Sequence, residues 1–250
     1  MKQVAGIVVA LPQEARALFG RLGWNRSGEF PTKAERFQDT FFMVAISGQG
    51  VERARRATRF LLKADPIFVL NFGVAGALVP GLKSGDLVIP GSITDGRNTE
   101  AIDSIPGEKI NAILQSNGIG FQNGLLVTHP EVAPSTSDKG NLHNSTGAIA
   151  VDMEAFGIYQ ECRSARVPFH IVKAITDTVD QTVPLSVTSC LSETGHVKLA
   201  QFTLNIICRP WLIPRLIEMQ KSFAAAVYSL EQVKLLLSIN ISRALISSSE

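Results

Sequence analysis

Short runs of apolar, often β-branched residues alternate along this chain with segments of helical periodicity. The apolar runs predict strands at 4–10, 41–47, 66–73, 86–92, 124–128, 148–153 and 169–176. The helical pattern predicts helices at 12–23, 51–63, 106–118 and 154–167. Strands and helices that alternate in this order indicate an α/β fold, with a mostly parallel sheet covered by helices on both faces.

Two polar, turn-rich segments interrupt the alternation, at 95–105 and 129–146. We predict that both are long surface loops, a kind of segment that often carries function. After Asp180 the pattern changes, because 181–195 reads as a loop and most of the remaining chain has helical periodicity. The prediction is one domain over 1–250, with a core at 1–180 and a helical C-terminal extension at 181–250.

Composition narrows the class of protein. Of the 250 residues 45% are hydrophobic and 18% are charged, as is typical of a globular chain. The net charge of +2 comes without a basic block, so nucleic acid is not expected as a partner. A secretory signal peptide is disfavoured, because Glu14 and Arg16 directly follow the first apolar run.

The cysteines and histidines predict neither a disulfide framework nor a metal site. None of the three cysteines lies in a CxxC pair, and four histidines lack metal-ligand spacing. An odd number of unpaired cysteines favours a reducing, cytoplasmic location. The cysteines are Cys162, Cys190 and Cys208.

Candidate chemistry lies where the predicted strands end, because ligands of open α/β sheets bind beyond the carboxyl ends of the strands. Glu14, Glu154 and Asp177 each follow a predicted strand, and the glycine-rich turns 47–50 and 73–76 follow two others. Each feature alone has a structural explanation, such as a first-turn acid, a turn glycine or a cap. Their combination at one edge of a sheet predicts a binding site.

The stretch "AVDMEAFG" (150–157) places two acids at the change from strand to helix. If the helix begins at Met153, then Asp152 and Glu154 point in different directions and differ in role. If Glu154 contacts a ligand, Asp152 is left to fix the end of the strand.

Three segments together resemble one family. They are "VLNFGVAGALVPGLKSGDLVIP" (69–90), "AIAVDMEAFGI" (148–158) and "VPFHIVKAITDTVD" (167–180). They resemble the purine nucleoside phosphorylase and nucleosidase superfamily, above all its methylthioadenosine/S-adenosylhomocysteine nucleosidases, over about 4–180. The resemblance implies a three-layer α/β/α fold with a mixed, mostly parallel sheet. It also implies an enzyme, often a homodimer, that cleaves the N-glycosidic bond of a small-molecule purine nucleoside without a cofactor.

The resemblance assigns roles to matching positions. Asp177 would protonate purine N7 as the general acid, Glu14 would activate the attacking water, and Met153 and Glu154 would hold the ribose. We expect burial to favour the protonated form of Asp177, and a helix N-terminus to favour the ionised form of Glu154. Further substrate contacts would come from Gly73, Val74, Ala75, Gln49 and Val132. The nucleophile pocket would include Gly48 and Lys173.

Two departures from the family pattern leave the nucleophile open. The arginine loop that phosphorylases use for phosphate has no counterpart here, which favours water. However, Val74 stands where the family has a small polar residue, and Lys173 stands where it has arginine. Phosphate therefore stays an alternative co-substrate, and a nucleoside-binding module without catalysis stays an alternative function.

The C-terminal segment adds a finer resemblance. "RPWLIPRL" (209–216), with "FGVAGAL" and "AVDME", resembles hopanoid-associated phosphorylases, which implies adenosylhopane as substrate. Apolar residues from Leu212 to Leu230 recur near helical spacing, with Arg215 and Lys221 among them. This pattern predicts either a helix packed on the core or on a second subunit, or a surface for peripheral membrane contact.

Overall fold

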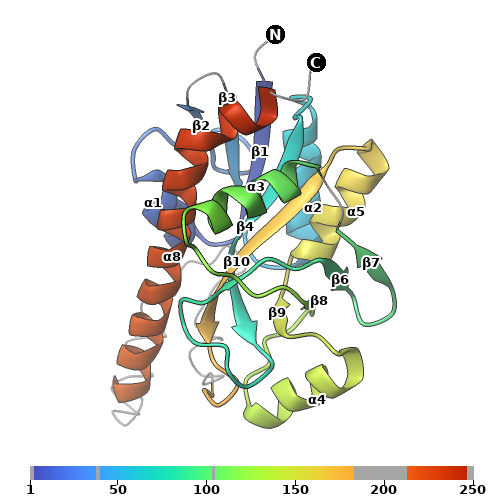
Figure 1. Ribbon diagram of the computed structural model, residues 1–250, viewed down its shortest axis with the longest axis vertical. Helices are drawn as coiled ribbons and strands as arrows, with labels where there is room; N and C mark the ends of the chain where they lie inside the picture. The colour runs from blue at the N-terminus through green and yellow to red at the C-terminus, as the bar shows by residue number, and fades with distance from the viewer. Residues whose placement is uncertain (1–2, 38–39, 103–104, 183–212, 247–250) are drawn as a thin grey trace.

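A ten-stranded mixed sheet lies between two layers of helices in the computed structural model, which describes residues 3–37, 40–102, 105–182 and 213–246 (Figure 1). One face carries α1 (Pro12–Phe19), α3 (Ile105–Ser116) and α8 (Ile213–Ile246). The opposite face carries α2 (Val51–Leu62) and α5 (Ala155–Ala165). The predicted three-layer α/β/α architecture is confirmed.

The sheet is built mainly from parallel pairs. The strands are β1 (Gln3–Val9), β2 (Thr32–Phe37), β3 (Thr40–Ile46), β4 (Phe68–Ala77), β5 (Leu87–Val88), β6 (Ser92–Thr94), β7 (Thr99–Ala101), β8 (Leu125–Thr128), β9 (Ala150–Asp152) and β10 (Phe169–Asp177). Their order is β2-β3-β1-β4-β9-β8-β6-β7, with β10 paired to β4 and β5. Four pairs are antiparallel, namely β2 with β3, β4 with β9, β5 with β10 and β6 with β7.

Strand β4, at the centre of the sheet, has a stretch without a strand partner on one of its edges. It pairs with β1 over 68–71 and with β9 only at Gly76 and Ala77, so 72–75 has no strand partner on that edge. The other edge of β4 pairs with β10 from Val69 to Gly76. The backbone N–H groups of 72–75 on the open edge are therefore available to side chains, near the carboxyl ends of β1 and β10.

Helix α8 packs on the core along its middle. Ala226, Leu230 and Val233 are fully buried in the same apolar cluster as Phe19 and Phe72. The first turns of α8 are more open, with Ile213 and Ile217 roughly half exposed. Packing on the core therefore accounts for the helical periodicity in this part of the chain.

The predicted loop at 129–146 is wrong in its second half, where α4 (Thr136–Thr146) forms. Ser135 and Asp138 form a capping box, and Gly147 ends the helix in the left-handed conformation. The helix was missed because its polar residues form no apolar stripe. Figure 1 shows α4 beyond the ends of the strands, away from both helical layers.

Other boundaries also differ from the predictions. The segment 95–105 contains β7, which forms an antiparallel hairpin with β6. Strand β2 was missed because its sequence, TKAERF, is mostly polar. The first helix ends at Phe19 instead of residue 23, since Gly20 has a positive φ of 74°. Only Leu87 and Val88 of the predicted strand 86–92 form a strand before β6 begins at Ser92.

Candidate functional site

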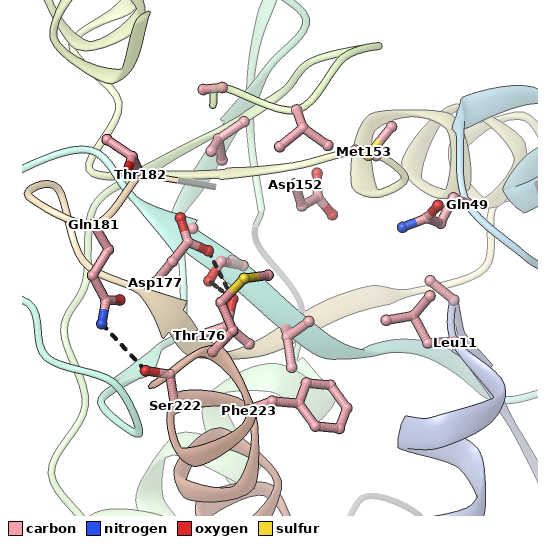
Figure 2. A pocket seen from close by; sticks show the side chains of 18 of the residues that line it. Leu11, Gln49, Asp152, Met153, Thr176, Asp177, Gln181, Thr182, Ser222 and Phe223 are labelled. Carbon is pink, nitrogen blue, oxygen red and sulfur yellow. Dashed lines mark hydrogen bonds between the residues drawn. The ribbon is translucent and has the colours of Figure 1, made fainter. Parts of the chain in front are cut away.

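A cavity of about 430 Å³ lies at the carboxyl ends of β1, β4 and β10 (Figure 2). Helix α8 closes one side, and the start of α5 lies opposite. Eight residues that the sequence predicted for the site line this cavity. They are Glu14, Gln49, Val74, Ala75, Val132, Met153, Glu154 and Asp177.

Three other predicted residues lie behind the wall of the cavity. A Cβ at Gly73 would come within 3.1 Å of Glu14 Oε1, so glycine here makes room for that carboxylate. Gly48 is buried and donates its N–H to the carbonyl of Ala10 at 3.0 Å. Lys173 is buried below the cavity. None of the three is among the lining residues.

Sequence reasoning missed a second set of lining residues. Helix α8 contributes one wall, and the segment after β10 contributes another, as Figure 2 shows for Ser222, Phe223, Gln181 and Thr182. The helical periodicity of α8 was visible in the sequence, but the face that would meet the cavity was not. The α8 residues are Arg215, Glu218, Met219, Ser222 and Phe223.

Glu14 is held by backbone amides on both oxygens. Its Oε2 accepts from Leu11 N at 2.8 Å, at the start of its own helix, and its Oε1 accepts from Val74 N at 3.0 Å, on the open edge of β4. Burial raises the pKa of Glu14, while these amides and the charge of Lys173 work against the rise. A buried carboxylate with a raised pKa can accept a proton.

Glu154 is the N-cap residue of α5 and is almost fully buried. Its Oε1 accepts from Gly50 N at 2.9 Å and its Oε2 from Met153 N at 3.3 Å. Burial, followed by the charge of Asp152, raises the pKa of Glu154 to about 7. Burial and a like charge thus oppose the helix N-terminus, so that Glu154 is only partly ionised near neutral pH.

Asp152 and Lys173 form a buried ion pair beneath Glu154. Lys173 Nζ lies 2.9 Å from Asp152 Oδ2, which also accepts from Ala155 N at 3.0 Å, and Asp152 Oδ1 accepts from Thr128 Oγ1 at 2.7 Å. Burial alone would lower the pKa of Lys173, but the charges of Asp152 and Glu154 raise it. Asp152 therefore joins the end of β9, the start of α5 and β10, in agreement with the structural role predicted for it.

We expect the stability of the Glu154→Gln variant, measured relative to the wild type, to increase between pH 4.5 and about 7. An exposed glutamate has a pKa of 4.5, so the folded protein binds more protons than the unfolded chain between pH 4.5 and about 7. The free energy of unfolding of the wild type therefore falls as pH rises through this window, by up to about 3 kcal/mol. The neutral amide removes this dependence.

Thermal unfolding of both proteins from pH 4.5 to 8 checks this expectation. The difference in Tm should grow with pH and level off above pH 7. Glu52→Gln, in the exposed first turn of α2, is the matched control and should follow the wild type. A Tm difference that stays constant over the range would contradict the assignment.

Asp177 has different surroundings from those expected. Its side chain is 24% exposed, its Oδ1 accepts from Thr176 Oγ1 at 2.9 Å, and its Oδ2 lies 2.5 Å from Lys139 Nζ. The predicted burial in an apolar environment is thus only partial, and a buried ammonium group that the sequence did not predict lies beside the carboxyl group. Sequence reasoning missed Lys139 because it lies in the segment predicted as a loop.

The lining of the cavity is strongly acidic. Carboxyl groups come from β9, β10, α1 and α8, and Arg215 is the only cationic residue among the described lining residues. No group of three or more His, Cys, Asp or Glu residues suited to a metal ion occurs in the part of the chain that the structure describes. Figure 2 shows Asp152 and Asp177 extending into one cavity, with Gln49 and Leu11 on the side away from Gln181.

Comparison with known families gives one match that spans most of the chain. A sequence model of the phosphorylase superfamily matches residues 4–201. The 5′-methylthioadenosine/S-adenosylhomocysteine nucleosidase of Buchnera aphidicola is 28% identical over 197 residues, which span 70% of this chain and 84% of that protein. The nucleosidase of the same name from Staphylococcus aureus is 26% identical over 205 residues, 72% of this chain and 89% of the relative.

Solved structures share the fold at low sequence identity. A Helicobacter pylori 5′-methylthioadenosine/S-adenosylhomocysteine nucleosidase with a bound pyrrolidine compound aligns with a TM-score of 0.73 and 16% identity, over 98% of this chain and 99% of that one. Futalosine hydrolase of the same organism aligns with a TM-score of 0.73 and 18% identity, over 97% and 99%.

Proposed function

The chain belongs to the phosphorylase superfamily, and from this premise we propose that it is a nucleosidase that hydrolyses the N-glycosidic bond of an adenine nucleoside. The observation that carries the choice of reaction is the acidic cavity, with Glu14, Glu154 and Asp177 around one space. The names of the curated relatives and of the aligned structures support cleavage of this bond.

Two different residues serve as the general acid and as the base that activates the attacking water. Asp177 gives its proton to N7 of the purine, and the electrons of the C1′–N9 bond move into the ring as the base leaves. Glu14 takes a proton from the water that attacks C1′. The two backbone amides that hold the Glu14 carboxylate support this role, because they fix the direction in which its oxygens accept.

The sugar and the base have their own contacts. Glu154 accepts hydrogen bonds from the 2′- and 3′-hydroxyl groups, and Met153 packs against the sugar ring. Met153 and Glu154 both line the cavity, at the start of α5. Val74, Ala75 and Val132 supply apolar contacts to the nucleoside, and Gln49 supplies a polar one, which suits the position of all four in the wall.

Water is favoured over phosphate because of the charge near Glu14. A phosphate dianion would lie beside the carboxyl groups of Glu14 and Glu154, and the nearest cation, Lys173, is already paired with Asp152. A water molecule carries no charge and suits an acidic, partly protonated site. Phosphate as co-substrate is the second candidate.

The substrate class is an adenine nucleoside with an apolar 5′ substituent, and adenosylhopane is the specific candidate. Met219 and Phe223 on α8, together with Leu11 at the N-terminus of α1, support an apolar group in this cavity. Peripheral membrane contact through the exposed start of α8 would bring a lipid-linked nucleoside to the site, and liposome flotation would detect it. A homodimer in the cytoplasm completes the proposal, and sedimentation of the purified protein would give the oligomeric state.

One experiment separates these candidates. The protein is incubated with adenosine, 5′-methylthioadenosine and adenine nucleosides that carry longer 5′ alkyl chains, each with and without phosphate. We expect adenine and a free ribosyl product in both conditions, with kcat/KM rising as the 5′ chain lengthens. A ribose 1-phosphate product would establish the phosphorylase instead. Tight binding of a nucleoside without release of its base would indicate that the protein is a nucleoside-binding module without catalysis.

A further inference from the structure

Lys139 is a buried cation whose three donors all have acceptors. Its side chain is 1% exposed although it lies on the polar helix α4. The ammonium group contacts Asp177 Oδ2 at 2.5 Å, the carbonyl of Thr178 at 2.7 Å and that of Gln181 at 3.0 Å. An ammonium with three donors is satisfied by this arrangement, so Lys139 is held in one position.

The contacts of Lys139 join three walls of the cavity. Helix α4 begins three residues after Ala133, which lines the cavity together with Val132. The two carbonyls belong to the segment after β10, and the Gln181 side chain continues to α8, where it donates to Glu218 Oε1 at 2.8 Å and to Ser222 Oγ at 3.4 Å. Displacement of the Lys139 ammonium would therefore disturb Asp177 and the wall around it together.

Two further neighbours, Gly76 and Thr176, limit the rotation of the Asp177 carboxyl group. Gly76 lies so close that a Cβ there would come within 3.1 Å of Asp177 Oδ2, and Thr176 donates to Oδ1. With Lys139 on Oδ2 and Thr176 on Oδ1, both oxygens have a donor within the protein. The orientation of the carboxyl group is therefore set before a nucleoside enters.

We propose that Lys139 is the positioning residue of the general acid, an inference that rests on the proposed function. Lys139 directs the Asp177 carboxyl group and stabilises the carboxylate that remains after the proton has moved. The proton passes from Asp177 to N7, the C1′–N9 electrons pass to the purine, and the new negative charge on Asp177 lies beside the ammonium. Lys139 keeps its own protons throughout. A fixed positive charge lowers the reaction barrier most when it lies beside the atom on which negative charge develops during the reaction.

The test compares two leaving groups on the same ribose. Adenine has to be protonated before it leaves, whereas the nitrophenolate of 4-nitrophenyl riboside leaves without a proton. Lys139→Met keeps most of the length of the side chain and removes its charge. We expect kcat for the adenine nucleoside to fall about 10- to 100-fold, within the range for general acid catalysis. Turnover of the nitrophenyl riboside should stay within about twofold of the wild type.

Two further variants keep the inference falsifiable if Lys139→Met unfolds. Lys139→Arg keeps the charge and should retain most of the adenine-releasing activity. Lys139→Gln removes the charge but can still donate to the two carbonyls. It should slow adenine release by itself and have no further effect on kcat in an Asp177→Asn background, because Lys139 acts through Asp177. Lys63→Met, at the exposed end of α2, is the matched control and should match the wild type on both substrates.

The outcomes separate failure of this inference from failure of the proposed function. If the wild type cleaves neither the adenine nucleoside nor the nitrophenyl riboside, the proposed function is wrong, and the proposed role of Lys139 is wrong with it. If the wild type turns over both substrates and Lys139→Met slows both equally, Lys139 is only structural. Unchanged turnover of both substrates by Lys139→Met would also overturn the inference.

Discussion

The Asp177→Asn variant is expected to lose about 10²- to 10⁴-fold in kcat for release of adenine, which corresponds to about 3–5 kcal/mol of barrier. Asparagine keeps the size of the side chain. Its amide oxygen can accept from Lys139 while its NH₂ donates to Thr176 Oγ1, but it has no acidic proton for N7. We expect KM to change only a few-fold, because the ribose contacts of Glu154 and Met153 are untouched. Steady-state kinetics with an adenine nucleoside measures both constants.

Asp177→Asn should also lower the stability of the fold. Loss of the charge leaves the buried Lys139 ammonium with two carbonyls and an amide oxygen, but without a counter-charge. We expect the free energy of unfolding to fall by about 1–3 kcal/mol, because the ammonium keeps its hydrogen bonds while its charge is no longer compensated. Asp180→Asn, also in the cavity wall but exposed, is the matched control and should keep most of the activity. Near-wild-type kcat in Asp177→Asn would remove the general-acid role.

The Glu14→Gln variant is expected to have a lower kcat with both substrates, the adenine nucleoside and the nitrophenyl riboside. Activation of water is required whichever group departs, so adenine release and nitrophenyl riboside turnover should each fall about 10²- to 10⁴-fold. This pattern differs from that of Asp177→Asn, which should affect adenine alone. The two variants therefore assign base and acid independently, through the ratio of kcat values on the two substrates.

The local structure predicts a second effect of Glu14→Gln. Both oxygens of Glu14 accept from backbone amides, so one of Leu11 N and Val74 N would face the new NH₂ group. A buried amide left without an acceptor costs about 1–3 kcal/mol, which should appear as a lower Tm. Glu131→Gln, which changes an exposed acid of the same cavity, is the control for charge. Equal loss of activity in Glu131→Gln would show that net charge, rather than the position of Glu14, matters.

The fold class was readable from the sequence because parallel strands buried on both faces are almost continuously apolar. The alternation of such runs with helical periodicity predicted the layers correctly. Elements without an apolar pattern, such as β2 and α4, were invisible for the same reason. Their formation depends on strand pairing and on caps.

The positions of Glu14, Glu154 and Asp177 in one cavity were also predictable. Each follows a strand of one sheet, and the carboxyl ends of parallel strands share an edge. Membership of the phosphorylase superfamily followed from the motifs around these residues and is confirmed. What the sequence determined by itself was therefore the class of fold and which acids stand at the strand ends.

Only the tertiary structure decided the surroundings of those acids. Lys139 meets Asp177 from 38 residues away, Gly50 meets Glu154 from 104 residues away, and α8 closes the cavity from the far end of the chain. The protonation of Glu154 and the charge beside Asp177 both depend on these contacts. Local patterns specify how a segment folds, but burial and electrostatics depend on which distant segments pack against it.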